Sequence, residues 1–254
     1  MNQLLESLPQ DAFRIIEPHL ERVALRPADV LYFADQRVDH VHFPTGGLVS
    51  IVVVMNSGQT AETSLVGRDG MVCSAVVLDV QDAIDQATVE IPTEAFRIRT
   101  EPFIAAYRKN EALRTSVNRY HALLIAESRQ STACNALHNA EQRLCRWLAD
   151  ACDRTGSDEL PLTQEFLGRM LGLRRSTVTE IYAVLQAQGL VSLTRGHTTI
   201  LNPQALRNRA CECYGILKIR ITRIFPDWAV LRPALDGTAK SALPDPLPPA
   251  TIST

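Results

Sequence analysis

The stretch that decides the fold covers residues 160–202 and reads LPLTQEFLGRMLGLRRSTVTEIYAVLQAQGLVSLTRGHTTILN. The hydroxyl of Thr163 can accept a hydrogen bond from the first turn of a helix, and Gly172 is a residue at which such a helix can end. A second helix begins within three residues of Gly172, so the spacing predicts two short helices joined by a tight turn. Apolar residues recur at helical spacing in both, at Phe166, Leu167, Met170 and Leu171 in the first and at Val178, Ile181, Tyr182 and Leu185 in the second.

Two β-prone runs follow the second helix. Residues 191–194 and 198–201 are rich in β-branched side chains, and the turn Arg195-Gly196-His197 separates them. This pattern is typical of a two-stranded hairpin. Two helices followed by a hairpin predict a winged helix-turn-helix.

Polar and basic residues gather near the start of the second helix, opposite its apolar side. The N-terminal part of a recognition helix is the part that meets base edges in the major groove of DNA. The same elements could also form an ordinary core, but their order and the basic exposed face favour DNA binding. The outward residues are Arg174, Arg175, Ser176, Thr179 and Glu180.

Composition indicates a globular protein of one or two domains. The chain has 254 residues, of which 46% are apolar, and no run approaches the roughly 18 residues that a membrane span requires. The start of the chain, MNQLLESLPQDAF, has no basic and apolar leader pattern, so we expect a cytoplasmic protein. The six cysteines form no paired CxxC motifs, and we expect them to be reduced and mostly buried.

Charge is distributed unevenly along the chain. The net charge is −2, which is unusual for a nucleic-acid binder. Residues 1–139 nevertheless hold 12 Lys and Arg against 17 Asp and Glu, whereas residues 140–225 hold 12 against 8. The basic part therefore contains the helix-turn-helix, as attraction to phosphates requires.

The upstream part of the chain predicts an α+β fold with an N-terminal antiparallel β-roll, or jelly roll. Short helices over residues 3–22 precede β-rich runs from about residue 23 to 98, separated by Gly, Pro and other turn residues. We predict a β-roll sensory domain over 1–110, a long dimerisation helix over 111–138 and a winged helix-turn-helix domain over 139–225. Residues 226–254 hold six of the 14 prolines and are predicted to be a mostly disordered tail.

The long helix carries residues in steps of four and three, the spacing of a two-stranded coiled coil. The second half of this predicted dimer seam is polar or small, which suggests that another element or a ligand lies there. In the alternative, this side of the helix lies along the β-roll of its own chain. The seam residues are Leu113, Val117, Tyr120, Leu124, Glu127, Ser131 and Cys134.

In the order of its elements, the chain resembles the Crp/Fnr family of bacterial transcription regulators. The resemblance covers roughly residues 4–214. The motifs that carry it are VHFPTGGLVSIV (41–52), VGRDGMV (66–72), LTQEFLGRMLGLRRSTVTEIYAVLQAQGLV (162–191), the wing TRGHTTIL and CECY (211–214). It implies a homodimer that binds a pseudo-palindromic operator in double-stranded DNA, with RNA polymerase as a further partner.

The resemblance also implies roles for the exposed residues. Arg175 is similar to the family arginine that donates two hydrogen bonds to a guanine, with Ser176, Thr179 and Glu180 at the other base-reading positions. The cyclic-AMP receptor protein has a carboxylate where this chain has Ser176, so a different half-site is expected. The predicted phosphate contacts are Thr163, Arg174, Thr177, Arg195, His197 and Thr198.

The predicted sensory domain departs from family members that bind cyclic nucleotides. Their phosphate cassette includes an arginine, but no arginine lies between Arg68 and Arg97 here. We therefore expect neither a cyclic nucleotide nor an iron-sulfur cluster, since no cysteine precedes Cys73. Haem bound through His40, His42, Cys73 or His121 is also not expected, and no metal site is predicted.

A different small-molecule effector could bind between the β-roll and the long helix. The candidate pocket residues are Cys73, Glu127 and Ser131. Oxidation that links Cys134 to the same residue of a dimer partner is a second hypothesis for the signal. Either the binding of an effector or the oxidation of Cys134 would change the position of the recognition helix relative to DNA.

The leading functional interpretation is a sequence-specific transcription regulator that is not an enzyme. No Gly-rich phosphate loop followed by Lys, no HExxH and no GxSxG motif occurs. The alternative is a ligand-binding regulatory module whose helix-turn-helix contacts proteins instead of DNA. The basic excess in residues 140–225 favours DNA.

Overall fold

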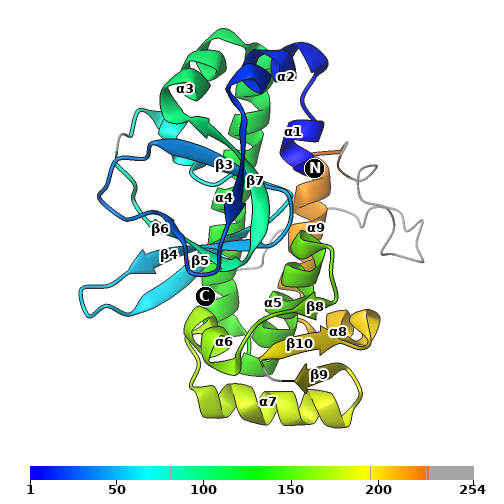
Figure 1. The fold of residues 1–254 in the computed structure, drawn as a ribbon. Helices are drawn as coiled ribbons and strands as arrows, with labels where there is room; N and C mark the ends of the chain where they lie inside the picture. The colour runs from blue at the N-terminus through cyan, green and yellow to red at the C-terminus, as the bar shows by residue number, and fades with distance from the viewer. Residues whose placement is uncertain (81, 195, 227, 229–254) are drawn as a thin grey trace, which may run out of the picture.

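The chain folds into a β-roll, a long central helix and a helical domain that carries a small sheet (Figure 1). The computed structural model describes residues 1–80, 82–194, 196–226 and 228. This architecture confirms the predicted α+β fold class. No helix in these residues is long and apolar enough to cross a membrane.

Two antiparallel sheets form the β-roll. The first has the order β1 (Glu21–Leu25), β7 (Thr93–Arg99), β3 (His40–Pro44). The second has the order β2 (Val30–Tyr32), β6 (Gln86–Ile91), β4 (Leu48–Val54), β5 (Thr60–Val66). The β-branched residues of β4 favour an extended strand, and its first five residues are buried.

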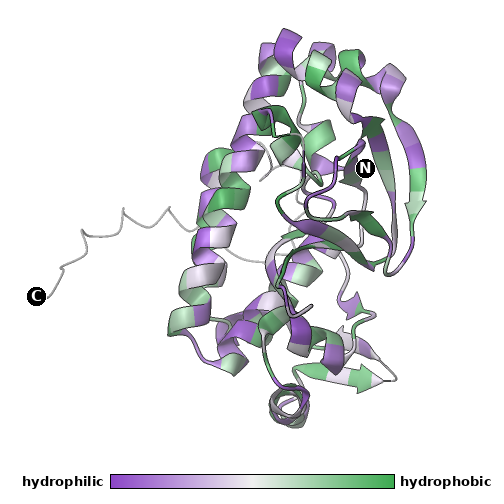
Figure 2. Ribbon diagram, turned by 90° about the vertical axis from the view of Figure 1, so that its left-hand side faces the viewer, coloured by the Kyte–Doolittle hydropathy of each residue, from purple (hydrophilic) through white to green (hydrophobic). Residues whose placement is uncertain are grey.

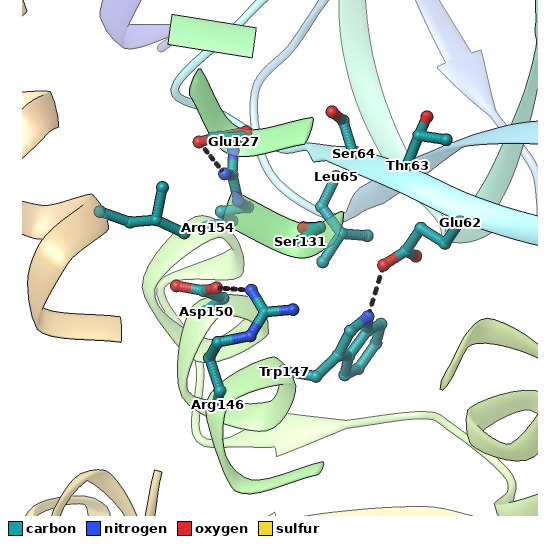
Figure 3. Close-up of a pocket in the computed structure, with 11 residues that line it drawn as sticks. Glu62, Thr63, Ser64, Leu65, Glu127, Ser131, Arg146, Trp147, Asp150 and Arg154 are labelled. Atoms are coloured by element: carbon teal, nitrogen blue, oxygen red, sulfur yellow. Dashed lines mark hydrogen bonds and ion pairs between the residues drawn. The ribbon is translucent and has the colours of Figure 1, made fainter. Parts of the chain in front are cut away.

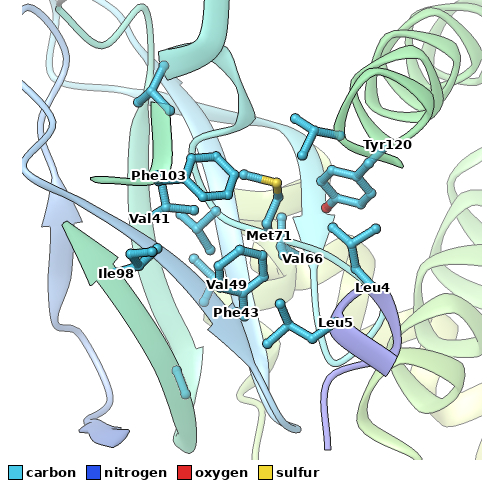
Figure 4. Close-up of a cluster of buried hydrophobic side chains, with 14 of the residues drawn as sticks. Leu4, Leu5, Val41, Phe43, Val49, Val66, Met71, Ile98, Phe103 and Tyr120 are labelled. Atoms are coloured by element: carbon cyan, nitrogen blue, oxygen red, sulfur yellow. The ribbon is translucent and has the colours of Figure 1, made fainter. Parts of the chain in front are cut away.

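Helices close the open sides of the β-roll. α1 (Gln3–Glu6), α2 (Gln10–Ile16), η1 (Glu17–His19), η2 (Ser74–Leu78) and α3 (Thr100–Lys109) surround it. Phe43 of β3 meets Phe103 of α3 edge-on, with ring centroids 6.1 Å apart. Met71 and Tyr120 lie in the same core (Figure 4).

The long helix α4 (Glu111–Leu137) runs along its own β-roll, and this corrects the predicted dimer seam. Leu113, Val117 and Tyr120 are buried in the core of the same chain. Glu127 pairs with an arginine of the same chain, and the Sγ atom of Cys134 lies 3.4 Å from that of Cys211. The heptad-spaced residues therefore pack within their own chain, and the sulfur of Cys134 is buried beside Cys211.

The helical domain begins at α5 (Ala140–Thr155), where Asn139 and Gln142 form the reciprocal cap expected from their spacing. β8 (Glu159–Leu160), α6 (Gln164–Leu171), α7 (Arg175–Ala187), β9 (Val191–Thr194), β10 (His197–Ile200) and α8 (Pro203–Arg209) follow. The small sheet has the order β8, β10, β9. A second core is built around Trp147, Leu148 and Tyr182.

The last described helix, α9 (Cys213–Ile224), leaves this domain and returns along α4 (Figure 1). Ile221, Phe225 and Trp228 are buried in the core of the N-terminal domain. The rings of Phe225 and Trp228 stack with centroids 4.0 Å apart. The predicted limits at residues 225 and 226 are therefore corrected: α9 packs on the N-terminal domain, and Trp228 is buried in its core. Residues 229–254 of the predicted tail lie outside the described residues.

Candidate nucleic-acid interface

The two helices of the predicted helix-turn-helix meet at a tight turn. The Thr163 hydroxyl accepts from the backbone N–H of Phe166 at 3.1 Å, as expected for a cap. Gly172 ends α6 with a φ of 62°, and the N–H of Leu173 donates to the carbonyl of Gly168 at 2.8 Å. A Cβ atom on Gly168 would lie 2.9 Å from the Leu173 carbonyl oxygen, so the turn can close this tightly only with glycine there.

Helix α7 projects at the end of the molecule that lies away from the β-roll, and it runs crosswise to α4 (Figures 1 and 2). Its apolar side is buried as predicted, with Val178, Ile181, Tyr182 and Leu185 in the second core. The five outward residues predicted near its start for base or phosphate contact are all exposed: Arg174, Arg175, Ser176, Thr179 and Glu180. Within the described residues, neither arginine forms an ion pair, so both guanidinium groups are available to a ligand.

Two of the predicted contacts are already engaged by neighbouring groups. The Thr179 hydroxyl lies 2.9 Å from Oε1 of Gln164 on α6, to which it can donate. Thr198 is fully buried, and its hydroxyl hydrogen-bonds to the Tyr182 hydroxyl at 2.9 Å. Thr198 therefore joins the wing to α7, and its predicted role as a phosphate contact is wrong.

The remaining predicted phosphate contacts surround α7. His197 and Thr163 are exposed and Thr177 is half-buried. Thr163 and Gly196 of the wing are neighbours, because a Cβ built on Gly196 would lie 3.5 Å from the Thr163 methyl carbon. Arg195 lies outside the described residues.

A buried ion bridge connects the β-roll to the helical domain. Arg154 of α5 donates to Asp69 of the β-roll at 2.9 Å and to Glu127 of α4 at 2.6 Å. None of the three residues is more than 7% exposed. Asp69 lies at the start of the stretch between Arg68 and Arg97 that contains no arginine, and its carboxylate is one of the two buried anions that pair with Arg154.

A small polar cavity lies beside this bridge, between β5, α4 and α5 (Figure 3). Glu127 and Ser131 line it, as the sequence predicted for an effector pocket. Its volume of about 20 Å³ is enough for about one water molecule. Cys73 is absent from its lining and precedes η2, so the three predicted pocket residues do not share one cavity.

A carboxylate at the edge of this cavity is perturbed by burial. Glu62 of β5 accepts from Trp147 Nε1 at 2.7 Å and from the Ser50 hydroxyl at 2.9 Å. Burial raises the pKa of Glu62 to about 7, although both hydrogen bonds act in the opposite direction. The hydrogen bond between β5 and α5 is therefore made by a carboxylate whose pKa is raised into the neutral range.

A larger cavity of about 380 Å³ lies away from this junction, between η2 and α3. Its volume is within the range typical of small-molecule sites. Arg108 pairs with Asp79 at 2.7 Å and Arg37 pairs with Glu101 at 3.4 Å at its rim. The sequence did not predict this cavity.

Sequence reasoning also missed a group of four residues at the junction of α4 and α5. Cys134 and His138 lie beside Cys211 and Cys213, although the sequence predicted no metal site and placed Cys134 on a dimer seam. The signal was present as Cys-x-x-x-His and Cys-x-Cys, two short spacings that are far apart in the chain.

Comparisons with known proteins agree with this geometry. Residues 142–209 match the family model of the Crp-like helix-turn-helix domain. No curated protein sequence matches the chain.

Solved structures share the fold over about three quarters of this chain, at low sequence identity. FixK2 from Bradyrhizobium japonicum has a TM-score of 0.65 at 16% identity, covering 76% of this chain and 98% of that one. A transcriptional regulator of the CRP/FNR family from Thermus thermophilus has a TM-score of 0.60 at 20% identity, covering 75% and 98%. CLP of Xanthomonas campestris, described as a c-di-GMP responsive global regulator, has a TM-score of 0.62 at 13% identity, covering 76% and 100%. The chain therefore has the fold of Crp/Fnr regulators and a Crp-like helix-turn-helix domain.

Proposed function

We propose that this chain, with the Crp/Fnr fold and a Crp-like helix-turn-helix domain, is a transcription regulator that binds specific DNA sequences as a homodimer. The observation that carries the proposal is the exposed first half of α7, where Arg174 and Arg175 are free of ion pairs among the described residues. Guanidinium groups suit guanine edges and phosphates because they present several donors in one plane. The protein acts by binding and not by catalysis.

In this proposal, Arg175 reads a guanine, while Ser176, Thr179 and Glu180 contact neighbouring bases. Thr179 reaches DNA by leaving Gln164, whose side-chain amide then becomes available to the DNA as well. Arg174, Thr163, Thr177, His197 and Arg195 contact phosphates. Two copies of α7 would enter successive major grooves of a pseudo-palindromic site.

The homodimer forms through the outward face of α4. Positions on this face also follow steps of three and four: Thr115, Asn118, Ala122, Ile125, Arg129 and Thr132. Ile125 is 42% exposed, and small residues near it allow two helices to approach closely. This face replaces the seam predicted from the sequence.

The proposed signal acts through the ion bridge formed by Asp69, Glu127 and Arg154. Because Arg154 belongs to α5 and Asp69 to the β-roll, a change at the bridge would alter how α5 and the attached α7 are held. A ligand at the junction would need the small cavity to open. RNA polymerase remains a predicted partner.

The experiment that tests the proposal is selection of binding sites from random double-stranded DNA, followed by fluorescence anisotropy over a range of salt concentrations. We expect one enriched pseudo-palindrome. With Arg174 and Arg195 of both copies at phosphates, affinity should fall on the order of a hundred-fold between about 50 and 200 mM salt. No enrichment, or affinity that is insensitive to salt, would instead support the alternative in which the helix-turn-helix contacts a protein.

A further inference from the structure

Four metal-ligating side chains converge where α4 ends and α9 begins. Cys134 lies in the last turn of α4, His138 directly follows that helix, and Cys211 and Cys213 lie just before and at the start of α9. Their ligand atoms, three sulfurs and one imidazole nitrogen, all lie within 4.8 Å of one another. The site is internal, since all three cysteines are buried.

Local structure explains why these residues meet. Cys134 and His138 are four residues apart at the end of a helix, so they project on the same side. Cys211 and Cys213 are separated by one residue in the short connection between α8 and α9, and this connection crosses that side. Each pair therefore provides two ligands from one direction.

Two of the distances between ligand atoms are close to those in a tetrahedral site. Bonds of about 2.3 Å to sulfur and 2.0 Å to nitrogen at tetrahedral angles place two sulfurs about 3.8 Å apart and a sulfur and a nitrogen about 3.5 Å apart. Here the sulfurs of Cys134 and Cys211 are 3.4 Å apart, and the sulfur of Cys213 lies 3.6 Å from Nδ1 of His138. A cluster of several irons would need its cysteine sulfurs spread more widely around it.

The groups behind the four ligands also resemble the surroundings of a metal site. The Gln130 side-chain amide donates to the sulfur of Cys213 at 3.0 Å. Nε2 of His138, the ring nitrogen that points away from the sulfurs, lies 3.8 Å from a Glu212 carboxylate oxygen. Donors to thiolates and carboxylates behind imidazoles orient the ligands of protein-bound metals.

Charge around the group favours a divalent ion. Three thiolates with one divalent cation leave a net charge of −1. The guanidinium groups of Arg143 and Arg146 lie near enough to Cys134 and Cys211 to interact electrostatically with them, and their positive charge would offset this remainder. Thiolate is the form of cysteine that binds metals.

Two simpler explanations account for less of the arrangement. Buried cysteines often pack as small apolar residues, yet these three form a buried cluster of cysteines alone within the described chain. A disulfide between Cys134 and Cys211 would use two ligands and leave Cys213 and His138 unexplained. Both pairs have a role only if one ion binds all four residues.

We propose that Cys134, His138, Cys211 and Cys213 bind one tetrahedral Zn²⁺ ion, which fastens the segment before α9 to the junction between α4 and α5. Soft thiolate ligands together with one imidazole select zinc among the common divalent ions. The ion would hold the helical domain at a fixed angle to α4. This inference does not depend on the protein binding DNA.

The test is metal analysis of the full-length protein, purified under reducing conditions without chelator and loaded with Zn²⁺. We expect one zinc per chain and, after exchange with Co²⁺, the visible spectrum of a tetrahedral cobalt-thiolate site. Cys213→Ser should weaken zinc binding at least ten-fold. Cys152→Ser, at another buried cysteine outside the group, should retain one zinc per chain.

A measurement on the unmodified protein covers the case in which a variant fails to fold. Alkylation followed by mass spectrometry should show Cys134, Cys211 and Cys213 protected with zinc and reactive after chelation, with no comparable change at Cys145. Less than a stoichiometric amount of zinc after loading, an iron-sulfur spectrum, or a Cys134–Cys211 disulfide in the reduced preparation would overturn the proposal. Equal zinc loss from Cys152→Ser and Cys213→Ser would also overturn it.

Discussion

Arg175 occupies the first residue of α7, where its side chain is exposed and the helix is closest to a DNA groove in the proposed complex. We expect Arg175→Ala to remove about 1–3 kcal/mol of discrimination at a single base pair, because a bidentate contact to guanine would be lost. The measurement is binding to the selected operator and to operators altered one base pair at a time.

Arg14→Ala is the matched control, because Arg14 is exposed on α2, within the N-terminal domain. It should leave the pattern of base preference unchanged. If Arg175→Ala weakens binding to every sequence equally, Arg175 is a phosphate contact and its assignment as a reader is wrong.

The second residue-scale prediction concerns Glu62, whose pKa is raised from 4.5 to about 7. Between these pH values the folded protein keeps a proton that the unfolded chain releases. The contribution of Glu62 to the free energy of unfolding therefore falls as pH rises from about 4.5 to about 7. Glu62→Gln keeps an acceptor oxygen for Trp147 and offers its amide N–H to the Ser50 hydroxyl, which can accept it. Because the glutamine cannot ionise, the free energy of unfolding of this variant relative to the parent should increase by about 1–3 kcal/mol over this pH range.

Urea unfolding at several pH values measures this difference. Glu94→Gln, at a carboxylate whose side chain is 64% exposed, serves as the control and should show little of the effect. A constant difference between Glu62→Gln and the parent from about pH 5 to about pH 8 would show that Glu62 does not titrate in this range.

At the scale of single residues, the sequence predicted which side chains are exposed better than it predicted which groups they contact. Helical spacing correctly placed Arg175 outward and Val178 inward, because both follow from the geometry of a single helix. It could not show that Thr198 hydrogen-bonds to Tyr182, since that depends on how the wing folds back over α7. The cysteine group was missed for the same reason: Cys134 and Cys211 are 77 positions apart.

At the scale of elements, α4 shows why periodicity alone cannot assign an interface. Spacing in steps of three and four identifies an apolar face but not the surface that covers it. The face carrying Leu113, Val117 and Tyr120 is covered by the chain's own β-roll and η2. The opposite face, around Ile125, is exposed, and it is the face proposed above to meet a second copy.

We expect Ile125→Glu to convert the homodimer into a monomer, because two like charges would meet at the centre of the proposed interface. Sedimentation equilibrium of the full chain measures this. The same change at Ile84, an exposed isoleucine of the β-roll with 73% of its surface accessible, should leave the dimer intact. A dimer that persists in Ile125→Glu would place the interface elsewhere.

At the scale of the whole molecule, the proposed zinc ion closes a loop that contains the entire helix-turn-helix domain. A cross-link between positions 77 residues apart removes enough freedom from the unfolded chain to stabilise the fold by about 4 kcal/mol. For a chain of this size, that corresponds to a melting temperature about 10 °C higher. We expect chelation to lower the melting temperature of the parent by about this amount.

Calorimetry with and without chelator makes this measurement. Cys213→Ser should melt at the lower temperature and should not respond to chelator, whereas Cys152→Ser should respond as the parent does. If chelation removes the zinc without changing the melting temperature of the parent, the ion does not act as a cross-link.

The return of α9 along α4 also has a mechanical consequence. A domain attached by one segment can both swing and twist about that segment. Here the backbone connects the helical domain to the N-terminal domain twice, through α4 on the way out and through α9 on the way back, with Trp228 buried in the N-terminal core. The ion bridge from Arg154 to Asp69 adds a side-chain connection to these two. Two attachments resist rotation about the axis of α4 and leave tilting as the easier motion. Any signal from the β-roll would then change the separation and inclination of two α7 helices more readily than the direction in which each one faces.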